Sequence, residues 1–385
     1  MKIVLLDITL SGHHLTYLRL FADAFRNLGN TVTVVSPASE KDLDIDGDIE
    51  CVTISKFEKP FGTQPWSIRR YLLDVWSFAA QAIGSLKPSN DTLIFFSYLD
   101  FFLECYVHRS EIDTIFPYNW SGLYMNPKNF RSKLSYQALR KGPLEPNHLL
   151  TCKRCKALTV LDRKSVKWLQ KKTRKPVVAL PDITDGSQPD FEFNPLKLLS
   201  EKLRHKKKIL LIGVLQKRKG VMQLMELIDH ELLKDYAIIM AGRLVRESFS
   251  REDLQIIEDR ESSADDSKFF FLQELPTEAI FNAFISSADI IYACYDGFLH
   301  SSNMIGKAAL FKKPILVARG GYMAEIVKDF KLGESVHYGN TEELILAIRK
   351  SESRQDTYGF EAYNSENSFK ELSHRLNSLI MDTFN

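Results

Sequence analysis

The sequence predicts an α/β protein made of two doubly wound, Rossmann-like domains that face a cleft. Three observations predict this fold class. The chain has 385 residues, more than one hydrophobic core usually covers, so two domains are expected. Short apolar runs of strand length alternate with stretches whose apolar residues have helical spacing. This alternation stops in a segment rich in turn residues and charge, and then starts again.

The first half is typical of a parallel sheet covered by helices. Its strand-length apolar runs are 3–6, 32–35, 93–96, 158–161 and 177–180. Between the first two runs, one helix face is indicated by Leu15, Leu18, Phe21, Ala22 and Phe25. Alternating strands and helices form parallel sheets. We therefore expect an N-terminal domain over residues 1–182.

The second half repeats this pattern after a linker that we place at 183–206. We expect a C-terminal domain over 207–362, with strands at 209–213, 237–242, 269–272, 290–294 and 315–317. Residues 363–385 are expected to form a closing helix, because their apolar residues again have helical spacing.

The composition is that of a globular protein with balanced charge. Hydrophobic residues make up 44% of the chain and charged residues 26%, as in ordinary soluble domains. The 51 basic and 49 acidic side chains leave a formal net charge of +2, which does not favour nucleic acid as a partner. No apolar stretch approaches the roughly 20 residues needed to span a bilayer, so we expect any membrane contact to be peripheral.

The cysteines indicate a reducing compartment. Five cysteines are an odd and sparse set for this length, which favours reduced thiols and a cytoplasmic location. Cys152 and Cys155 have the spacing of a metal or redox pair, but no second pair and no histidine couple accompany them. We interpret them as ordinary thiols and predict no metal site.

Two loops of the second half could bind phosphate. Ser301, Ser302 and Asn303 are good N-cap residues at the start of a helix, where free N–H groups attract anions. The alternative is an ordinary capped helix. The other loop, which follows Gly213, contains Lys217, Arg218 and Lys219, cations that could meet a diphosphate. The alternative is that these three charged side chains form a solvated surface and bind nothing.

Taken in order, the motifs of the second half resemble the C-terminal domain of GT-B glycosyltransferases similar to family 4. The first half adds a weaker likeness, with Gly12 opening the first helix and 28–34 leading into the second strand. The second-half set is Gly213, 219–220, 241–242, 271–272, 287–290, 307–314 and 320–326.

The resemblance implies that residues 1–182 form an acceptor-side domain and residues 207–362 a nucleotide-sugar-binding domain, and it implies roles for several residues. Lys219 matches a lysine that contacts the donor diphosphate, and Val214 stands where an arginine is usual, so Lys217 or Arg218 is expected to supply that contact. Gln273 and Leu275 match the position where the nucleotide base is seated.

The acidic pair of the family is altered. Lys307 occupies the position of the second glutamate and Leu299 that of the first, unless Asp296 replaces the first in a loop three residues longer. We expect a variant loop in which Ser301, Ser302, Asn303 and Lys307 receive phosphates.

Candidate catalytic residues lie in the first half. Gly12 permits close approach to the donor, and His13 or His14 could donate a hydrogen bond or act as a base. Alternatively, one histidine packs against the helix start and the other is solvated. Asp100 follows the third apolar run and is our candidate for orienting or deprotonating the acceptor, or else it caps the next helix.

Two surface segments suggest contact with the inner membrane face. Residues 56–76 mix aromatic and basic side chains, and residues 153–175 are strongly basic; both compositions suit anionic headgroups. The alternative is a pair of amphipathic helices whose basic faces are solvated.

These observations favour a glycosyltransferase, with UDP-sugar as the default donor and a glycan or lipid-linked acceptor. The resemblance implies retention and hexosyl transfer without a metal. We expect no cofactor other than the donor substrate and no nucleic-acid partner. Two alternatives remain: a non-catalytic GT-B relative that binds a nucleotide sugar or a protein, and a sugar-nucleotide epimerase.

Overall fold

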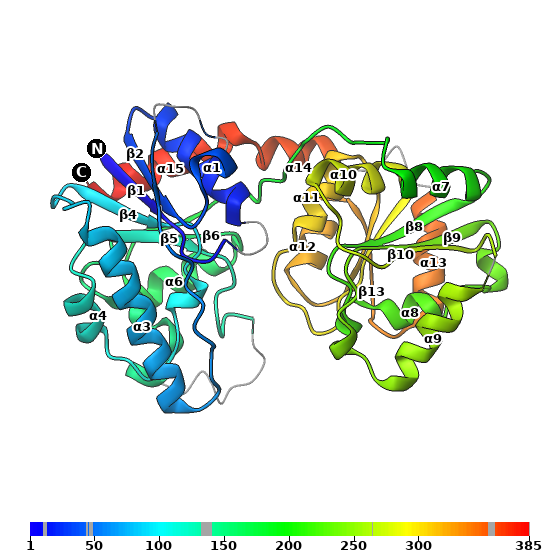
Figure 1. Cartoon of the computed structure of the whole chain (residues 1–385), viewed down its shortest axis with the longest axis horizontal. Helices are drawn as coiled ribbons and strands as arrows, with labels where there is room; N and C mark the ends of the chain where they lie inside the picture. Colours follow the sequence, from blue (N-terminus) through cyan, green and yellow to red (C-terminus); the bar gives the residue numbers. More distant parts are fainter. Residues whose placement is uncertain are drawn as a thin grey trace. The chain divides into compact units, whose positions relative to one another are not determined.

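The computed structural model describes residues 1–10, 14–43, 45, 49–131, 141–263, 265–352 and 359–384. The chain divides into two compact units (Figure 1). Unit 1 comprises Met1–Pro181 and Ser368–Asn385, and unit 2 comprises Asp182–Asn367. In the residues just given, each unit contains one parallel sheet with helices between its strands, so the predicted α/β fold class is confirmed.

Within its described residues, unit 1 has a seven-stranded sheet in the order β3-β2-β1-β4-β5-β6-β7. All neighbouring pairs are parallel. The strand order reverses at β1, which lies between β2 and β4, so β1 and β4 mark the switch point where ligands of open α/β sheets bind. The strands are β1 (Lys2–Leu6), β2 (Thr31–Ser36), β3 (Glu50–Thr53), β4 (Thr92–Phe96), β5 (Trp120–Tyr124), β6 (Leu158–Val160) and β7 (Val177–Ala179).

An aromatic cluster holds one face of this sheet. Trp76 is fully buried, and the ring centres of Phe102 and Trp120 lie 5.1 and 5.3 Å from its own. Its indole Nε1 donates to the carbonyl of Phe102 at 3.1 Å, so the polar atom of the ring is satisfied. The helices of unit 1 are α1 (His14–Asn27), α2 (Glu40–Leu43), α3 (Pro65–Gly84), α4 (Arg109–Ile115), α6 (Ser165–Thr173) and α15 (Phe369–Phe384).

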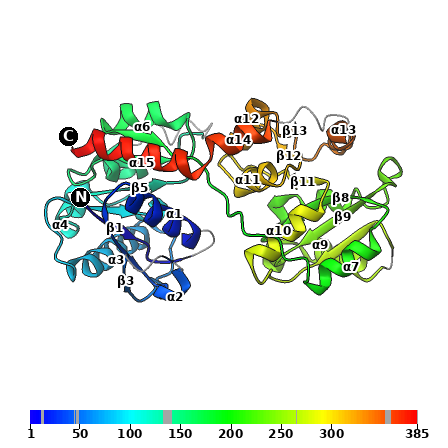
Figure 2. The same cartoon turned by 90° about the horizontal axis from the view of Figure 1, so that it is seen from above.

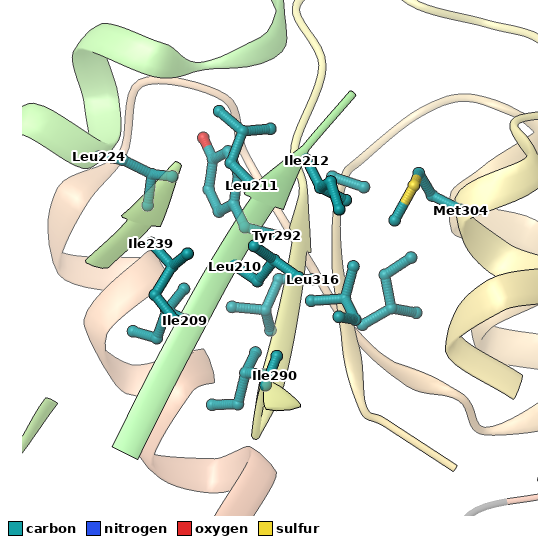
Figure 3. Close-up of a cluster of buried hydrophobic side chains, with 14 of the residues drawn as sticks. Ile209, Leu210, Leu211, Ile212, Leu224, Ile239, Ile290, Tyr292, Met304 and Leu316 are labelled. Carbon is teal, nitrogen blue, oxygen red and sulfur yellow. The ribbon is translucent and has the colours of Figure 1, made fainter. Parts of the chain in front are cut away.

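The described part of unit 2 has a six-stranded parallel sheet in the order β10-β9-β8-β11-β12-β13. Here the switch point lies between β8 and β11. Figure 3 draws part of the core, where side chains of β8, β9 and β11 lie together with Leu224 and Met304. The strands are β8 (Lys207–Ile212), β9 (Tyr236–Ala241), β10 (Lys268–Phe271), β11 (Ile290–Ala293), β12 (Ile315–Ala318) and β13 (Gly333–Val336).

The expected linker contains a helix that belongs to unit 2. Leu196 and Leu199, on α7 (Asn194–Lys202), are buried in its core, and α7 packs against α10 (Glu278–Ser287). The C-terminal helix α15 returns to unit 1, where it packs on α1 and β7 (Figure 2). The other helices of unit 2 are α8 (Val221–Met225), α9 (Arg251–Ser262), α11 (Asn303–Leu310), α12 (Tyr322–Phe330), α13 (Thr341–Glu352) and α14 (Phe360–Glu366).

None of the helices in the described ranges is both long and apolar enough to cross a membrane.

Candidate functional site

The backbone of the loop after β8 packs directly against the backbone that follows β9. Gly213 and Gly242 both have positive φ, +99° and +126°. A Cβ on Gly242 would lie only 2.0 Å from the carbonyl oxygen of Gly213, so no larger residue fits there without moving the loop. The N–H of Gly242 donates to the carbonyl of Phe271 at 2.8 Å. The ends of β8, β9 and β10 are therefore held at one edge of the sheet.

The turn Lys217–Lys219 brings Lys219 back to this edge. A Cβ placed on Gly213 would lie 3.9 Å from the Lys219 Nζ, and the same Nζ lies 5.4 Å from the centre of the Tyr295 ring. No carboxylate pairs with Lys219 among the described residues. Burial, together with repulsion from Arg218, lowers the pKa of Lys219 to about 8. A partly desolvated cation without a counter-ion favours an incoming anion.

The two cations next to Lys219 differ in whether a carboxylate already pairs with them. Lys217 Nζ lies 2.6 Å from the Asp253 carboxylate, so its charge is already matched. Arg218 is exposed, with its guanidinium 5.7 Å from the centre of the Phe298 ring. Its carbonyl accepts from the N–H of Asp296 at 2.6 Å, which ties this loop to the segment after β11. Arg218 is therefore better placed than Lys217 to bind an anion together with Lys219.

The helix start at α11 makes its contacts within unit 2. Ser302 is the N-cap and accepts from the N–H of Met304 at 3.4 Å. The hydroxyl of Ser301 donates to the Asp182 carboxylate, and the side chain of Asn303 accepts from the Thr184 hydroxyl. These side chains hold the segment that opens unit 2, so the sequence-predicted phosphate ligands already have protein partners.

Lys307 is completely buried. Its ammonium group donates to the carbonyl of Asp185 at 2.8 Å and to the side chain of Asn282, and it pairs with Glu278. A charge removed from water is tolerated when it is paired and hydrogen-bonded in this way. The geometry gives Lys307 a role in joining α11 to α10, and we leave it out of the proposed phosphate-binding set.

Gln273 and Leu275 follow β10, whose last residue, Phe271, bonds to Gly242. Gln273 is exposed, and Leu275 packs partly against the core. Both therefore lie at the same edge of the sheet as Gly213 and Lys219.

In unit 1, a carboxylate that our sequence analysis missed holds His14. Asp7 directly follows β1, and its Oδ2 lies 2.7 Å from His14 Nδ1 and 2.6 Å from the Ser97 hydroxyl. Its Oδ1 accepts from the N–H groups of Thr9 and Leu10 at 2.9 and 3.0 Å. Burial by itself raises the pKa of Asp7, but the hydrogen bond and charge of His14, with the other donors, outweigh it and bring the pKa below its ordinary value.

Asp7 thus fixes the orientation of the His14 ring. The ring centre of Tyr98 lies 4.4 Å from that of His14, and His14 is 7% exposed. Within the described ranges its Nε2 has no hydrogen-bond partner, so this nitrogen is available to a substrate group. Gly12 and His13, the other expected residues of this loop, lie outside the described residues.

Asp100 lies beyond β4 and borders a pocket of about 460 Å³ within unit 1. Its two carboxylate oxygens accept from the N–H groups of Met125 and Asn126, each at 2.9 Å. Burial outweighs these bonds and raises the pKa of Asp100 to about 6. Asp100 therefore holds a loop and also faces a cavity.

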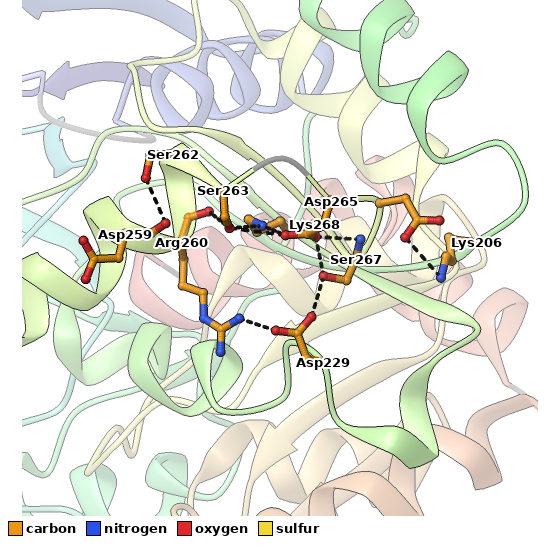
Figure 4. Close-up of polar contacts among 10 residues, drawn as sticks. Lys206, Asp229, Asp259, Arg260, Ser262, Ser263, Asp265, Ser267 and Lys268 are labelled. Carbon is orange, nitrogen blue, oxygen red and sulfur yellow. Dashed lines mark hydrogen bonds and ion pairs between the residues drawn. The ribbon is translucent and has the colours of Figure 1, made fainter.

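A smaller pocket of about 200 Å³ lies at the opposite, amino-terminal edge of the unit 2 sheet. Figure 4 shows the charged pairs around it, including Arg260 with Asp229 and Lys268 with Asp265. These charges neutralise one another between α9 and β10. We interpret this cluster as structural.

The cysteine pair is buried. Cys152 and Cys155 are at most 1% exposed, and burial raises the pKa of Cys155 to about 12. Lys175 donates to the carbonyl oxygens of both residues. In the part of the chain that is described, no group of three His, Cys, Asp or Glu side chains could hold a metal ion.

No protein-family model matches this sequence, and no curated protein sequence matches it at a significant level. Solved structures of GT-B glycosyltransferases nevertheless share its fold over the whole chain, so the class that the fold defines is GT-B.

Three such structures illustrate the likeness. WaaG, a glycosyltransferase involved in lipopolysaccharide biosynthesis, is 13% identical, with full coverage of both chains and a TM-score of 0.59. The α,α-trehalose 6-phosphate synthase of Burkholderia multivorans is 12% identical over 99% of this chain and 98% of its own, with a TM-score of 0.70. The UDP-forming synthase of Burkholderia xenovorans, in complex with glucose-6-phosphate, is 11% identical over 100% and 99%, with a TM-score of 0.69.

Proposed function

We propose that this protein is a glycosyltransferase. In this proposal unit 2 binds a nucleotide-sugar donor and unit 1 binds the acceptor. The observation that carries it is Lys219, a desolvated ammonium group at the switch point of unit 2 that has no counter-ion in the described ranges. Ligands of open α/β sheets bind at this place, and a diphosphate supplies the missing negative charge.

Lys219 and Arg218 would neutralise the diphosphate as it leaves. Fixed positive charge aimed at a leaving group stabilises the transition state, which is the role that a metal has in other transferases. UDP is the default nucleotide. The resemblance to family 4 implies transfer of a hexosyl group with retention and without a metal.

On the acceptor side, His14 is the residue best prepared to contact a reacting group. Asp7 holds its Nδ1 at 2.7 Å, which leaves Nε2 to accept a hydrogen bond from a hydroxyl. A carboxylate that orients a histidine in this way also fixes which nitrogen carries the proton. We propose a glycan or lipid-linked acceptor.

Contact with the inner face of a membrane would bring such an acceptor within reach. Trp66, at the start of α3, is 72% exposed, and Lys56 and Arg70 are exposed near it in the sequence. The basic segment 153–175 supports this contact less, because Lys172 pairs with Glu145 at 2.9 Å and Lys175 bonds to carbonyl groups. We therefore assign the contact to residues 56–76.

One observation favours a second candidate, a non-catalytic relative that binds a nucleotide sugar. Lys307 occupies the position of a family glutamate, and its ammonium group is buried against Glu278 and Asn282. The carboxylate contact expected there is absent. Measurement of donor turnover separates the two candidates, because the relative would bind the donor without consuming it.

The test is calorimetric titration of the metal-free protein with UDP, GDP, ADP and their sugar conjugates. We expect one nucleotide to bind, and the Lys219→Ala variant to weaken that binding at least about tenfold, since a hydrogen bond to a charged group contributes roughly 1.5–3 kcal/mol. Lys217→Ala is the matched control, because Lys217 is already paired with Asp253. Equal losses in the two variants would remove the assigned role of Lys219.

A further inference from the structure

The pocket beside Asp100 lies where an acceptor would bind. It is formed within unit 1 by segments that follow β1, β3 and β4, including Thr9, Phe57 and Asp100. The N–H of Phe57 donates to the carbonyl of Ile8 at 2.9 Å, so the segments after β1 and β3 are fixed together. Its volume of about 460 Å³ is in the roughly 300–1,000 Å³ range of small-molecule sites.

Aromatic rings form one wall of this pocket. The Tyr71 ring packs edge to face against Phe61 and Phe57, with centre distances of 5.1 and 5.6 Å. Phe61 is 51% exposed, so part of its ring is open to a ligand. Ring faces of this kind pack against the C–H face of a sugar, while a few polar groups orient its hydroxyls.

The charged groups of the pocket are already paired. Lys128 forms an ion pair with Glu104 and donates to the carbonyl of Leu103 at 2.7 Å. Lys59 lies 2.8 Å from the Asp74 carboxylate. Among the described residues, both lysines that line the pocket are thus paired with a carboxylate, and the charge of Lys128 also acts on Asp100. A phosphate group would therefore find no unpaired cation here and would have to displace a carboxylate from a lysine.

Asp100 has remaining capacity for hydrogen bonds. Each of its oxygens accepts one backbone N–H, and an ionised carboxylate offers about four acceptor positions in all. Sugar hydroxyls can donate to those that are left. The same carboxylate that repels a phosphate thus attracts a polyhydroxylated neutral group.

We propose that this pocket binds the acceptor through an uncharged sugar ring, which packs on Phe61 and Tyr71 and donates hydroxyl groups to Asp100. This inference rests on the proposed function, because it names the acceptor class of the same enzyme. An uncharged acceptor would distinguish this protein from the trehalose-phosphate synthase whose structure contains glucose-6-phosphate. Phosphorylated sugars are poor ligands of this pocket.

The experiment is ligand-observed NMR on the full-length protein without nucleotide. The probes are the methyl glycosides of glucose, galactose, mannose and N-acetylglucosamine, each compared with the corresponding 6-phosphate. We expect at least one uncharged glycoside to bind and its 6-phosphate to bind at least about tenfold more weakly, since unfavourable placement of charge costs more than one hydrogen bond. Failure of all the glycosides to bind, or tighter binding of the phosphates, would overturn the proposal.

Three variants locate the binding. Phe61→Ala and Asp100→Asn should each weaken glycoside binding several-fold or more. Phe191→Ala is the matched control: it removes a phenylalanine ring of similar exposure, 50%, from unit 2, outside the pocket lining. Phe61 is half exposed, so Phe61→Ala should still fold. This variant therefore tests the proposal even if Asp100→Asn disturbs the loop at 125–126. Unchanged binding in Phe61→Ala would overturn the proposal.

A further variant tests the charge argument. Asp74→Asn removes the partner of Lys59 and should strengthen binding of the 6-phosphate several-fold, with no change for the uncharged glycoside. An unchanged preference would contradict the charge argument.

The two proposals fail separately. Glycoside binding here together with no nucleotide binding anywhere would overturn the transferase proposal alone. Nucleotide binding that depends on Lys219, together with no glycoside binding, would overturn only the present inference.

Discussion

The ammonium group of Lys219 lies 5.4 Å from the centre of the Tyr295 ring. Lys219 follows β8 and Tyr295 follows β11, so the two residues join the two sides of the unit 2 switch point. The ring supplies a weak attraction for the cation but no counter-charge. The result is a lysine whose proton is unusually easy to lose in the free protein.

Nucleotide binding should therefore be coupled to proton uptake. The pKa of Lys219 is lowered to about 8, and a bound diphosphate favours the charged form and raises that pKa. At pH 8 the complex should take up a fraction of a proton, and affinity should fall as pH rises above about 8. Titrations in two buffers of different ionisation enthalpy measure the uptake. Lys219→Arg keeps the charge and should abolish the uptake; an unchanged uptake would exclude Lys219 as its source.

Gly220 should be intolerant of a side chain because of Tyr292. Its φ is +80°, and a Cβ would lie 2.2 Å from the Tyr292 hydroxyl, which bonds to Gln223 at 2.7 Å. Gly339 has a φ of +81° with nothing within 4 Å of its Cβ position. Both alanine variants carry the same backbone strain, so Gly220→Ala should be about 1–3 kcal/mol less stable than Gly339→Ala. Urea unfolding measures the difference, and equal stabilities would argue against this contact.

Lys307 should contribute to folding more than to nucleotide binding. Its removal leaves the buried Asn282 side chain and the carbonyl of Asp185 without their donor and the partly exposed Glu278 without its cation, so Lys307→Met should lower the free energy of unfolding by about 1–3 kcal/mol. Lys312→Met is the control, because the Lys312–Glu361 pair is exposed and contributes at most about 1 kcal/mol. Denaturant unfolding gives both values. If Lys307→Met is as stable as the parent but has lost nucleotide binding, the phosphate role expected from the sequence is correct after all.

Asp7 should stabilise unit 1 in a pH-dependent way. Its pKa in the folded protein is below its ordinary value of 3.8. Its stabilising contribution is therefore present above about pH 4 and is lost as pH falls through the lower, folded pKa. Asp7→Asn should lower stability by about 1–3 kcal/mol at neutral pH, and by less below pH 4. Asp23→Asn, in the surface pair with Arg26, should change it by at most about 1 kcal/mol. A constant difference from pH 3 to 7 for Asp7→Asn would show that its charge is not involved.

The fold class could be predicted from the sequence because its evidence is local. Apolar runs such as 93–96 are buried along their whole length in β4, as strands covered on both faces must be. The helical spacing that includes Phe21 and Phe25 gives the buried face of α1. The helix α7 inside the segment expected as a linker was not recognised, because it has few residues and it packs against α10.

The contacts of the candidate site residues could not be predicted from local sequence patterns. Ser301, Asn303 and Lys307 carry the residue types of a phosphate site, but their partners lie 25 to 122 residues earlier in the chain. No local pattern reveals such pairing. Asp7 was missed because it looks like the last residue of the first strand. The available signal was a carboxylate directly after that strand and seven residues before a histidine.

The sequence by itself determined the alternation of strands and helices, the glycines of the loop after β8 and the presence of Lys219 in it. These follow from periodicity and from backbone sterics, which act between near neighbours. The tertiary structure alone decided which charges are free. It pairs Lys307, Lys217 and Lys128 and leaves Lys219 desolvated without a carboxylate among the described residues. Desolvation and pairing depend on groups brought together from distant parts of the chain, so they appear only when the chain has folded.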